Sequence, residues 1–128
     1  MTQEKIADAH VQTRRIYNLL GEIYDLSQQL ADALDRDDQI TVQMLLGMRE
    51  EPIRKLAETK EILMRQVTEA GPEDAEHLRA LLNGKAAAVE NEKGLAEQVA
   101  VNMRMLKQVQ ELDEHLNRKI TRGKSVYQ

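Results

Sequence analysis

The chain of 128 residues is rich in helix-forming side chains and has almost no aromatic ones. It has 41% hydrophobic and 31% charged residues, three tyrosines and no Phe, Trp or Cys, so the composition excludes a disordered chain, disulfides and thiolate chemistry. The formal net charge of −4 argues against a surface for nucleic acid. Two prolines and six glycines give too few turns for an all-β fold. We therefore expect one all-α domain over residues 1–128.

No segment is typical of a membrane span or of a signal peptide. No apolar stretch approaches the ~20 residues that a transmembrane helix needs. The first fifteen residues include Glu4, Lys5 and Asp8, where a signal peptide would have its apolar run. The expected location is the cytoplasm, without membrane insertion.

The first predicted helix runs from Gln3 to Leu34. Its apolar residues recur three and four positions apart through most of this length, which is the period of one helix face; they are Ile6, Ala9, Ile16, Leu20, Ile23, Leu26 and Leu30. The acidic turn from Asp35 to Asp38 follows, and an Asp there can accept hydrogen bonds from the free amides of the next helix.

The second predicted helix runs from Gln39 to Glu69 and contains Pro52. A proline deep in a helix deletes one amide donor and collides with the carbonyl four residues earlier. We therefore expect a kink or a break between about Met48 and Ile53. The pair Gly71 and Pro72 predicts the next boundary, because Gly commonly closes a helix and Pro commonly opens one.

The third predicted segment, Glu73 to Ile120, is the longest, at roughly 70 Å if it is one helix. Gly84 and Gly94 flank its weakest part. In an antiparallel bundle, part of a helix of this length would have no neighbouring helix to pack against, unless the segment folds back or pairs with another chain. A homodimer is therefore one possible arrangement. The predicted fold is an elongated antiparallel bundle of three long helices with an extended third helix.

The sequence has no pattern that predicts catalysis, a cofactor or a metal. His10, His77 and His115 lie far apart among charged neighbours, and we expect them at the surface. The two serines have no His within a turn, and no phosphate-binding glycine loop occurs. We therefore expect a binding protein rather than an enzyme. Its methionines are either core filler or part of a helix-binding surface.

The layout resembles the flagellar type III export chaperones of the FlgN group and, more loosely, those of the FliT group. The resemblance lies in a long first helix, the acidic turn from Asp35 to Asp38, the run from Leu45 through Arg49 to Leu56, a long amphipathic third segment and the basic end from Arg122 to Tyr127. Pro52 departs from the family pattern, in which the second helix reads as uninterrupted. The resemblance implies a cytoplasmic, non-catalytic chaperone. Such a protein keeps hook-associated or filament-cap proteins soluble and delivers them to the export apparatus.

The client-binding residues expected by this analogy follow the apolar seam of the third segment. They are Val99, Met103, Leu106, Val109, Leu112, Leu116 and Ile120, with Tyr127 as a further contact. Gly123 is expected to end the helix and to leave residues 124–128 free. Residues 121–128 are assigned as a flexible basic tail. The alternative function is a structural coiled-coil scaffold that self-associates through the same seam.

Overall fold

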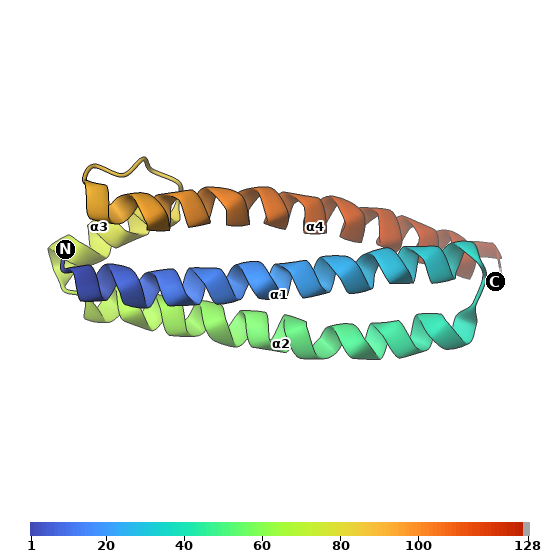
Figure 1. Cartoon of the computed structure of the whole chain (residues 1–128). Helices are drawn as coiled ribbons and strands as arrows, with labels where there is room; N and C mark the ends of the chain where they lie inside the picture. Colours follow the sequence, from blue (N-terminus) through green and yellow to red (C-terminus); the bar gives the residue numbers. More distant parts are fainter. Residues whose placement is uncertain (127–128) are drawn as a thin grey trace.

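The computed structural model describes residues 1–126, with side chains to residue 122, and this part of the chain is helical without a strand. The elements are α1 (Gln3–Asp35), α2 (Gln39–Glu69), α3 (Pro72–Leu82), the 3-10 helix η1 (Glu90–Glu92) and α4 (Lys93–Val126). Figure 1 shows an elongated bundle in which α1 and α2 run antiparallel. The predicted all-α class is therefore confirmed, whereas the predicted count of three helices is corrected by the separate α3.

The boundaries of α1 and α2 follow local capping. Thr2 accepts a hydrogen bond from the backbone amide of Lys5 at 3.3 Å. Asp38 accepts one from the amide of Thr41 at 3.1 Å and one from its hydroxyl at 2.6 Å. These bonds to Thr41 hold the pKa of Asp38 below its usual value. The predicted capping role of the acidic turn is thus confirmed.

Helix α2 continues through Pro52, so the break that was predicted as an alternative to a kink is wrong. Proline removes only one amide donor, and the helix is held on both sides of it by residues buried in the bundle, among them Leu45 and Leu63. Pro52 is itself buried. Packing of the apolar face therefore outweighs the local cost of the proline.

Replacing Pro52 with Ala is expected to raise the free energy of unfolding by about 1 kcal/mol. The amide gained at position 52 can donate to the carbonyl of Met48, which relieves part of the ~3 kcal/mol cost of an interior proline, while the smaller side chain loses buried apolar area at ~0.8 kcal/mol per methylene. Urea denaturation measures the difference. A lower stability of Pro52→Ala would show that the ring's packing is worth more than the restored hydrogen bond.

The predicted third helix is two helices, because the chain folds back after Leu82. Asn83 caps α3, and Gly84 has a φ of 98° that an L side chain rarely adopts. Residues 83–89 then return along the bundle to η1, and α4 begins near the end of the molecule at which α3 began (Figure 1). This reversal removes the length mismatch, since α4 has 34 residues against 33 in α1.

Helix α4 extends to Val126, so the prediction that Gly123 ends the helix is wrong, and residues 121–126 of the predicted tail belong to this helix. One glycine costs a helix only about 1 kcal/mol relative to Ala, which the neighbouring helix formers can offset. The predicted contact residue Tyr127 lies outside the described residues.

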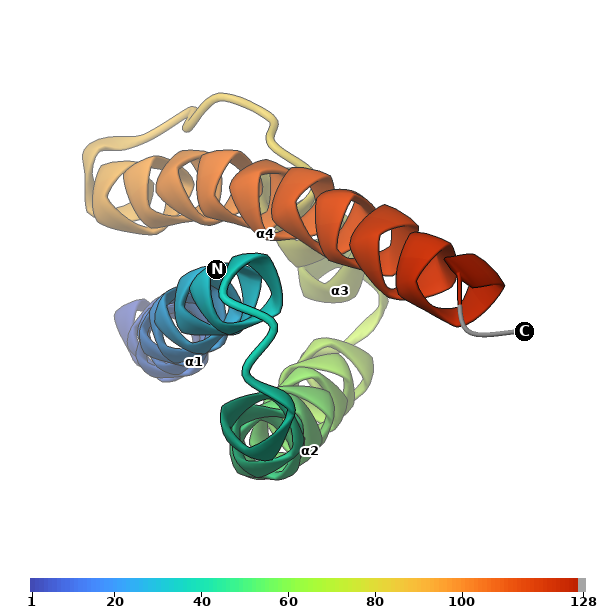
Figure 2. The ribbon, with the colours of Figure 1, turned by 90° about the vertical axis from the view of Figure 1, so that its right-hand side faces the viewer.

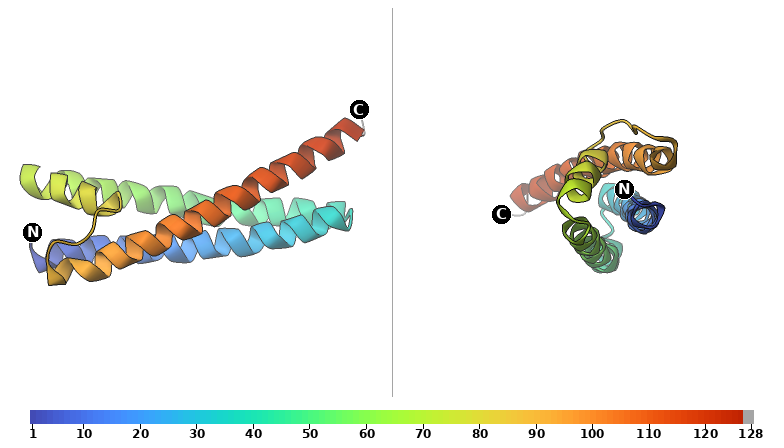
Figure 3. Two further views of the ribbon diagram at one scale, coloured as in Figure 1. Left: turned by 90° about the horizontal axis from the view of Figure 1, so that it is seen from above. Right: turned by 90° about the vertical axis from the view of Figure 1, so that its left-hand side faces the viewer.

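Helix α1 is the central element of the bundle. It packs against both α2 and α4. In the described part of the chain, by contrast, no Cα atom of α2 lies within 8 Å of one in α4. Figure 2 shows α2 and α4 on different sides of α1, and Figure 3 shows that α4 crosses the α1–α2 pair obliquely. The short helix α3 lies between α2 and α4 at one end and contacts both.

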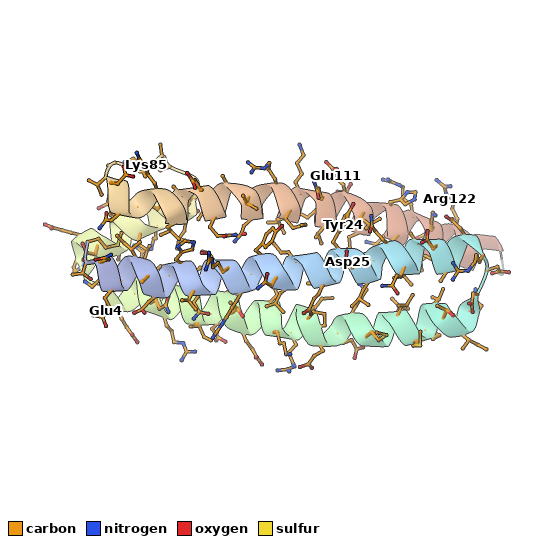
Figure 4. All side chains as sticks on the ribbon, in the orientation of Figure 1. Glu4, Tyr24, Asp25, Lys85, Glu111 and Arg122 are labelled. Atoms are coloured by element: carbon orange, nitrogen blue, oxygen red, sulfur yellow. The ribbon has the colours of Figure 1, made fainter. Side chains whose placement is uncertain are left out.

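Two apolar cores follow from this arrangement. The proximal core lies at the α3 end and contains Ile6, Ala9, Ile16, Leu20, Leu63, Val67, Ala75, Leu78, Leu81, Leu95 and Val99. The distal core lies at the opposite end and contains Leu30, Ala33, Val42, Leu45 and Leu116. The outer surface is charged: Figure 4 shows Lys85, Glu111 and Arg122, all exposed, pointing away from the bundle.

Candidate functional site

An apolar cleft of about 210 Å³ lies between α1, α2 and α4, beside the end of α3 at Leu82. It is lined by Thr13, Ile16 and Leu20 from α1, Lys60 and Leu63 from α2, Leu82 from α3, and Val99, Asn102, Met103 and Leu106 from α4. Four helices thus contribute to one cleft. Its lining is predominantly apolar, as in binding sites for hydrophobic ligands.

The cleft exists because α3 is short. Over its 11 residues α3 fills the space between α2 and α4, where Leu78 and Leu81 are completely or almost completely buried. Leu82, its last residue, lies at the wall of the cleft. Beyond Leu82 the chain leaves this space, and the buried side chains of Ile16 and Leu20 on α1 form the floor of the cleft.

Met103 forms an adaptable wall of the cleft. Its side chain is 44% exposed, and a Cβ atom placed on Gly84 would lie 3.2 Å from both its Cε and its Sδ atoms. The thioether therefore rests against the loop that follows α3. Because methionine is flexible and unbranched, it can repack when the cleft is occupied.

The polar groups of the cleft are already engaged, except for one lysine. Asn102 donates to the carbonyl of Thr13 at 2.8 Å and accepts from Gln98 at 3.0 Å. Thr13 donates to the carbonyl of His10 at 2.9 Å. Lys60 is exposed, and within the described chain it has no ion-pair partner. The cleft therefore offers an apolar surface with one free cation at its edge.

The structure brings three of the predicted client-binding residues together in this cleft, namely Val99, Met103 and Leu106. Leu116 is buried in the distal core instead, and Val109 and Leu112 are partly buried against the two cores. Ile120 is half-buried. The residues of α1 and α2 that complete the cleft were not predicted, because helix periodicity does not indicate which helices diverge.

A second feature that the sequence analysis missed joins α3 to η1. The side chain of Glu92 is 2% exposed, and its Oε1 and Oε2 both contact Nε2 of His77, the latter at 2.9 Å. The two residues are fifteen positions apart, and only the reversal of the chain brings them together. Nearby, Gly94 lies against the ring of His10, whose pKa is lowered by burial and, to a smaller extent, by Arg14.

The start of α3 is fastened to α1 by charge. Lys5 donates to the Ala70 carbonyl and to the Asp74 carboxylate, each at 2.8 Å. The hydrogen bond from Lys5 to the Asp74 carboxylate is the main reason that the pKa of Asp74 lies below its usual value. The charges of Lys5, the N-terminus and His77 lower it further. At the far end of the bundle Arg49 of α2 reaches Asp113 of α4 at 2.8 Å. That ion pair spans the space between the diverging helices.

Neither a metal centre nor a membrane span is found in the described residues. No three His, Asp or Glu side chains converge there as metal ligands would. None of the helices is both long enough and apolar enough to cross a bilayer. Comparisons with protein-family models, curated proteins and solved structures each found no match to this chain.

Proposed function

We propose that this chain is a non-catalytic cytoplasmic chaperone that holds an amphipathic helix of a client protein in the cleft between α2 and α4. The observation that carries the proposal is the apolar cleft left open where α3 ends. Laying the apolar face of a helix into such a groove is a recurrent mode of protein recognition. It would shield the client's apolar residues from water until release.

The register of α2 supports a binding surface longer than the cleft itself. Ile53 lies seven residues before Lys60 and Met64 lies four residues after it, so all three share one side of α2. Ile53 is 45% exposed and Met64 is 56% exposed. Exposed apolar residues that continue a cleft are typical of an interaction surface. The client is therefore expected to contact α2 as well as α4.

The resemblance to flagellar export chaperones supplies the class of client. It suggests a hook-associated or filament-cap protein that is bound before secretion and then passed to the export apparatus. The alternative of a scaffold that dimerises through the α4 seam is less favoured. Val99 and Leu116, two residues of that seam, are already buried within the chain. Pairing with a second copy through them would require α4 to leave α1.

The test is to mix the purified chain with the hook-associated and filament-cap proteins encoded in the same genome. We expect a complex of defined stoichiometry by light scattering and a higher melting temperature with client, since binding to the folded state stabilises it. Met103→Asp should weaken the complex. Met44→Asp is the matched control, because Met44 is 56% exposed and does not line the cleft. A stable dimer of the chain that binds none of these clients would support the scaffold function instead.

A further inference from the structure

The cleft beside α3 is suited to an aromatic ring. Its volume of about 210 Å³ exceeds the ~150 Å³ of an apolar protein cavity that binds benzene. The amide of Asn102 and the hydroxyl of Thr13 already form hydrogen bonds within the chain, so neither requires a polar ligand as a partner. A large apolar group is therefore the occupant that the lining favours.

No aromatic side chain among the described residues fills this space. The chain contains neither Phe nor Trp, and neither Tyr17 nor Tyr24 lines the cleft. Helix α3 ends at Leu82, on the cleft wall. Met103, a flexible side chain in the wall, can move aside from the loop at Gly84. A ring in the cleft would then come from another molecule.

A partner helix seated in the cleft would be short. Its length along α2 would be set by the interval from Leu63 in the cleft to Arg49, whose ion pair with Asp113 joins α2 to α4. Fourteen residues of helix correspond to about 21 Å, or roughly four turns. An occupant helix would continue the line of α3, which already packs between α2 and α4.

The charge at the cleft edge specifies a second feature of the partner. Lys60 is the only charged residue in the lining, and it has no ion-pair partner in the described chain. An Asp or Glu one turn from the ring, on the same face of the partner helix, would meet it. We infer that the cleft is an anchor pocket for one aromatic side chain of a partner helix, with an acidic residue of that helix paired to Lys60. This inference rests on the proposed function and names the chemistry of the client.

A designed amphipathic peptide of about four turns tests the inference directly. It carries Trp at its centre and Glu one turn away, and calorimetry compares it with the same peptide in which Trp is Ala or Glu is Gln. We expect the loss of Trp to weaken binding about tenfold or more, as for a buried aromatic hot spot. The loss of Glu should weaken binding about two- to fivefold, the value of an exposed ion pair.

The charge pairing has its own control within α2. In the Lys60→Gln variant the Glu and Gln peptides should bind equally. In the Lys55→Gln variant they should differ as they do with the original chain, because Lys55 is also exposed but lines a separate pocket on another side of α2. Equal binding of the Glu and Gln peptides to the original chain would overturn the assigned role of Lys60.

A variant that fills the pocket separates occupancy from folding. Met103→Trp introduces the only tryptophan of the chain at a 44% exposed position of the cleft. We expect its fluorescence to be blue-shifted, its melting temperature to be unchanged or higher, and the Trp peptide to bind at least about tenfold more weakly. Met48→Trp, at a 50% exposed position outside the cleft, should show solvent-exposed emission and normal binding.

Two outcomes would overturn the anchor pocket while leaving a helix-binding chaperone in place: equal affinities of the Trp and Ala peptides, or normal peptide binding by Met103→Trp. If no peptide binds, titration with free indole decides, with the methyl resonance of Met103 as the readout. A shift at Met103 without shifts at Met44 and Met48 would support the pocket and count against helix binding. The absence of any shift would overturn the pocket as well.

Discussion

Replacing His77 with Ala is expected to lower the free energy of unfolding by about 1–3 kcal/mol, the cost of leaving a buried hydrogen-bonding group without its partner. Glu92 is 2% exposed, and both of its carboxylate oxygens contact the His77 ring. Without the imidazole, a carboxylate would stay buried without its partner. The cost comes mainly from that unpaired charge and less from the contact that is lost.

Urea denaturation of three variants checks this expectation. Glu92→Gln in the His77→Ala background should recover part of the loss, because a neutral amide is less costly to bury than a carboxylate. His115→Ala serves as the matched control, since His115 is exposed on α4 and surface substitutions usually change stability by less than ~0.5 kcal/mol. Equal, small effects of His77→Ala and His115→Ala would show that the pair does not hold α3 to η1.

Loss of the contact between His77 and Glu92 would also affect the candidate cleft. His77 lies on α3 and Glu92 lies directly before α4, so their contact fixes the two segments that flank the returning loop. That loop contains Gly84, against which Met103 rests. Hydrogen exchange in α3 and in the first turns of α4 is therefore expected to quicken in His77→Ala, whereas the turn at Asp38 should keep its protection.

The first two helices could be predicted almost residue by residue because their ends depend on local chemistry. Asp38 caps α2 through its own side chain, and Pro72 opens α3 just after Gly71. Such signals act over three or four residues and are legible in the sequence. The interruption at Pro52 was overestimated for the opposite reason, since contacts with distant residues keep α2 continuous.

The reversal after Leu82 was harder to predict. The three- and four-residue spacing of the seam continues across residues 83–92 through Lys85, Val89 and Glu92, so periodicity alone favours one long helix. The structure instead places Gly84 at positive φ and Glu92 in the 3-10 turn beside His77. The unusual seam positions of Lys85 and Glu92 were the available signal. A charged residue on an apolar face marks a weak helix, but it does not reveal the partner that makes the alternative stable.

The candidate cleft could be predicted only on its α4 side. The seam identifies Val99, Met103 and Leu106, because one face of a helix follows from its period. That Ile16 and Leu20 form the floor depends on α1 packing against both long partners while these diverge. The sequence contains no local mark of that divergence, since it results from the oblique crossing of α4 and the shortness of α3.

Replacing Leu116 with Ala is expected to lower the free energy of unfolding by about 2–5 kcal/mol, the range for deleting a fully buried leucine side chain. Leu116 is 1% exposed and is the residue through which α4 enters the distal core, where it joins Leu30 and Leu45. Leu30 and Leu45 are held by α1 and α2, so the cavity left by the removal of the Leu116 side chain would collapse only in part.

The Leu106→Ala variant is the control for Leu116→Ala, because it separates an effect on stability from an effect on binding. Leu106 is only partly buried and lines the open cleft, so its loss should cost clearly less stability than the loss of Leu116 while weakening the binding of the Trp peptide. Leu116→Ala should leave the affinity of that peptide unchanged at temperatures where the variant is folded. Denaturation and calorimetry on the two variants measure both quantities. If Leu116→Ala cost little stability and abolished peptide binding, the client surface would lie on the distal seam of α4 and not in the cleft beside α3.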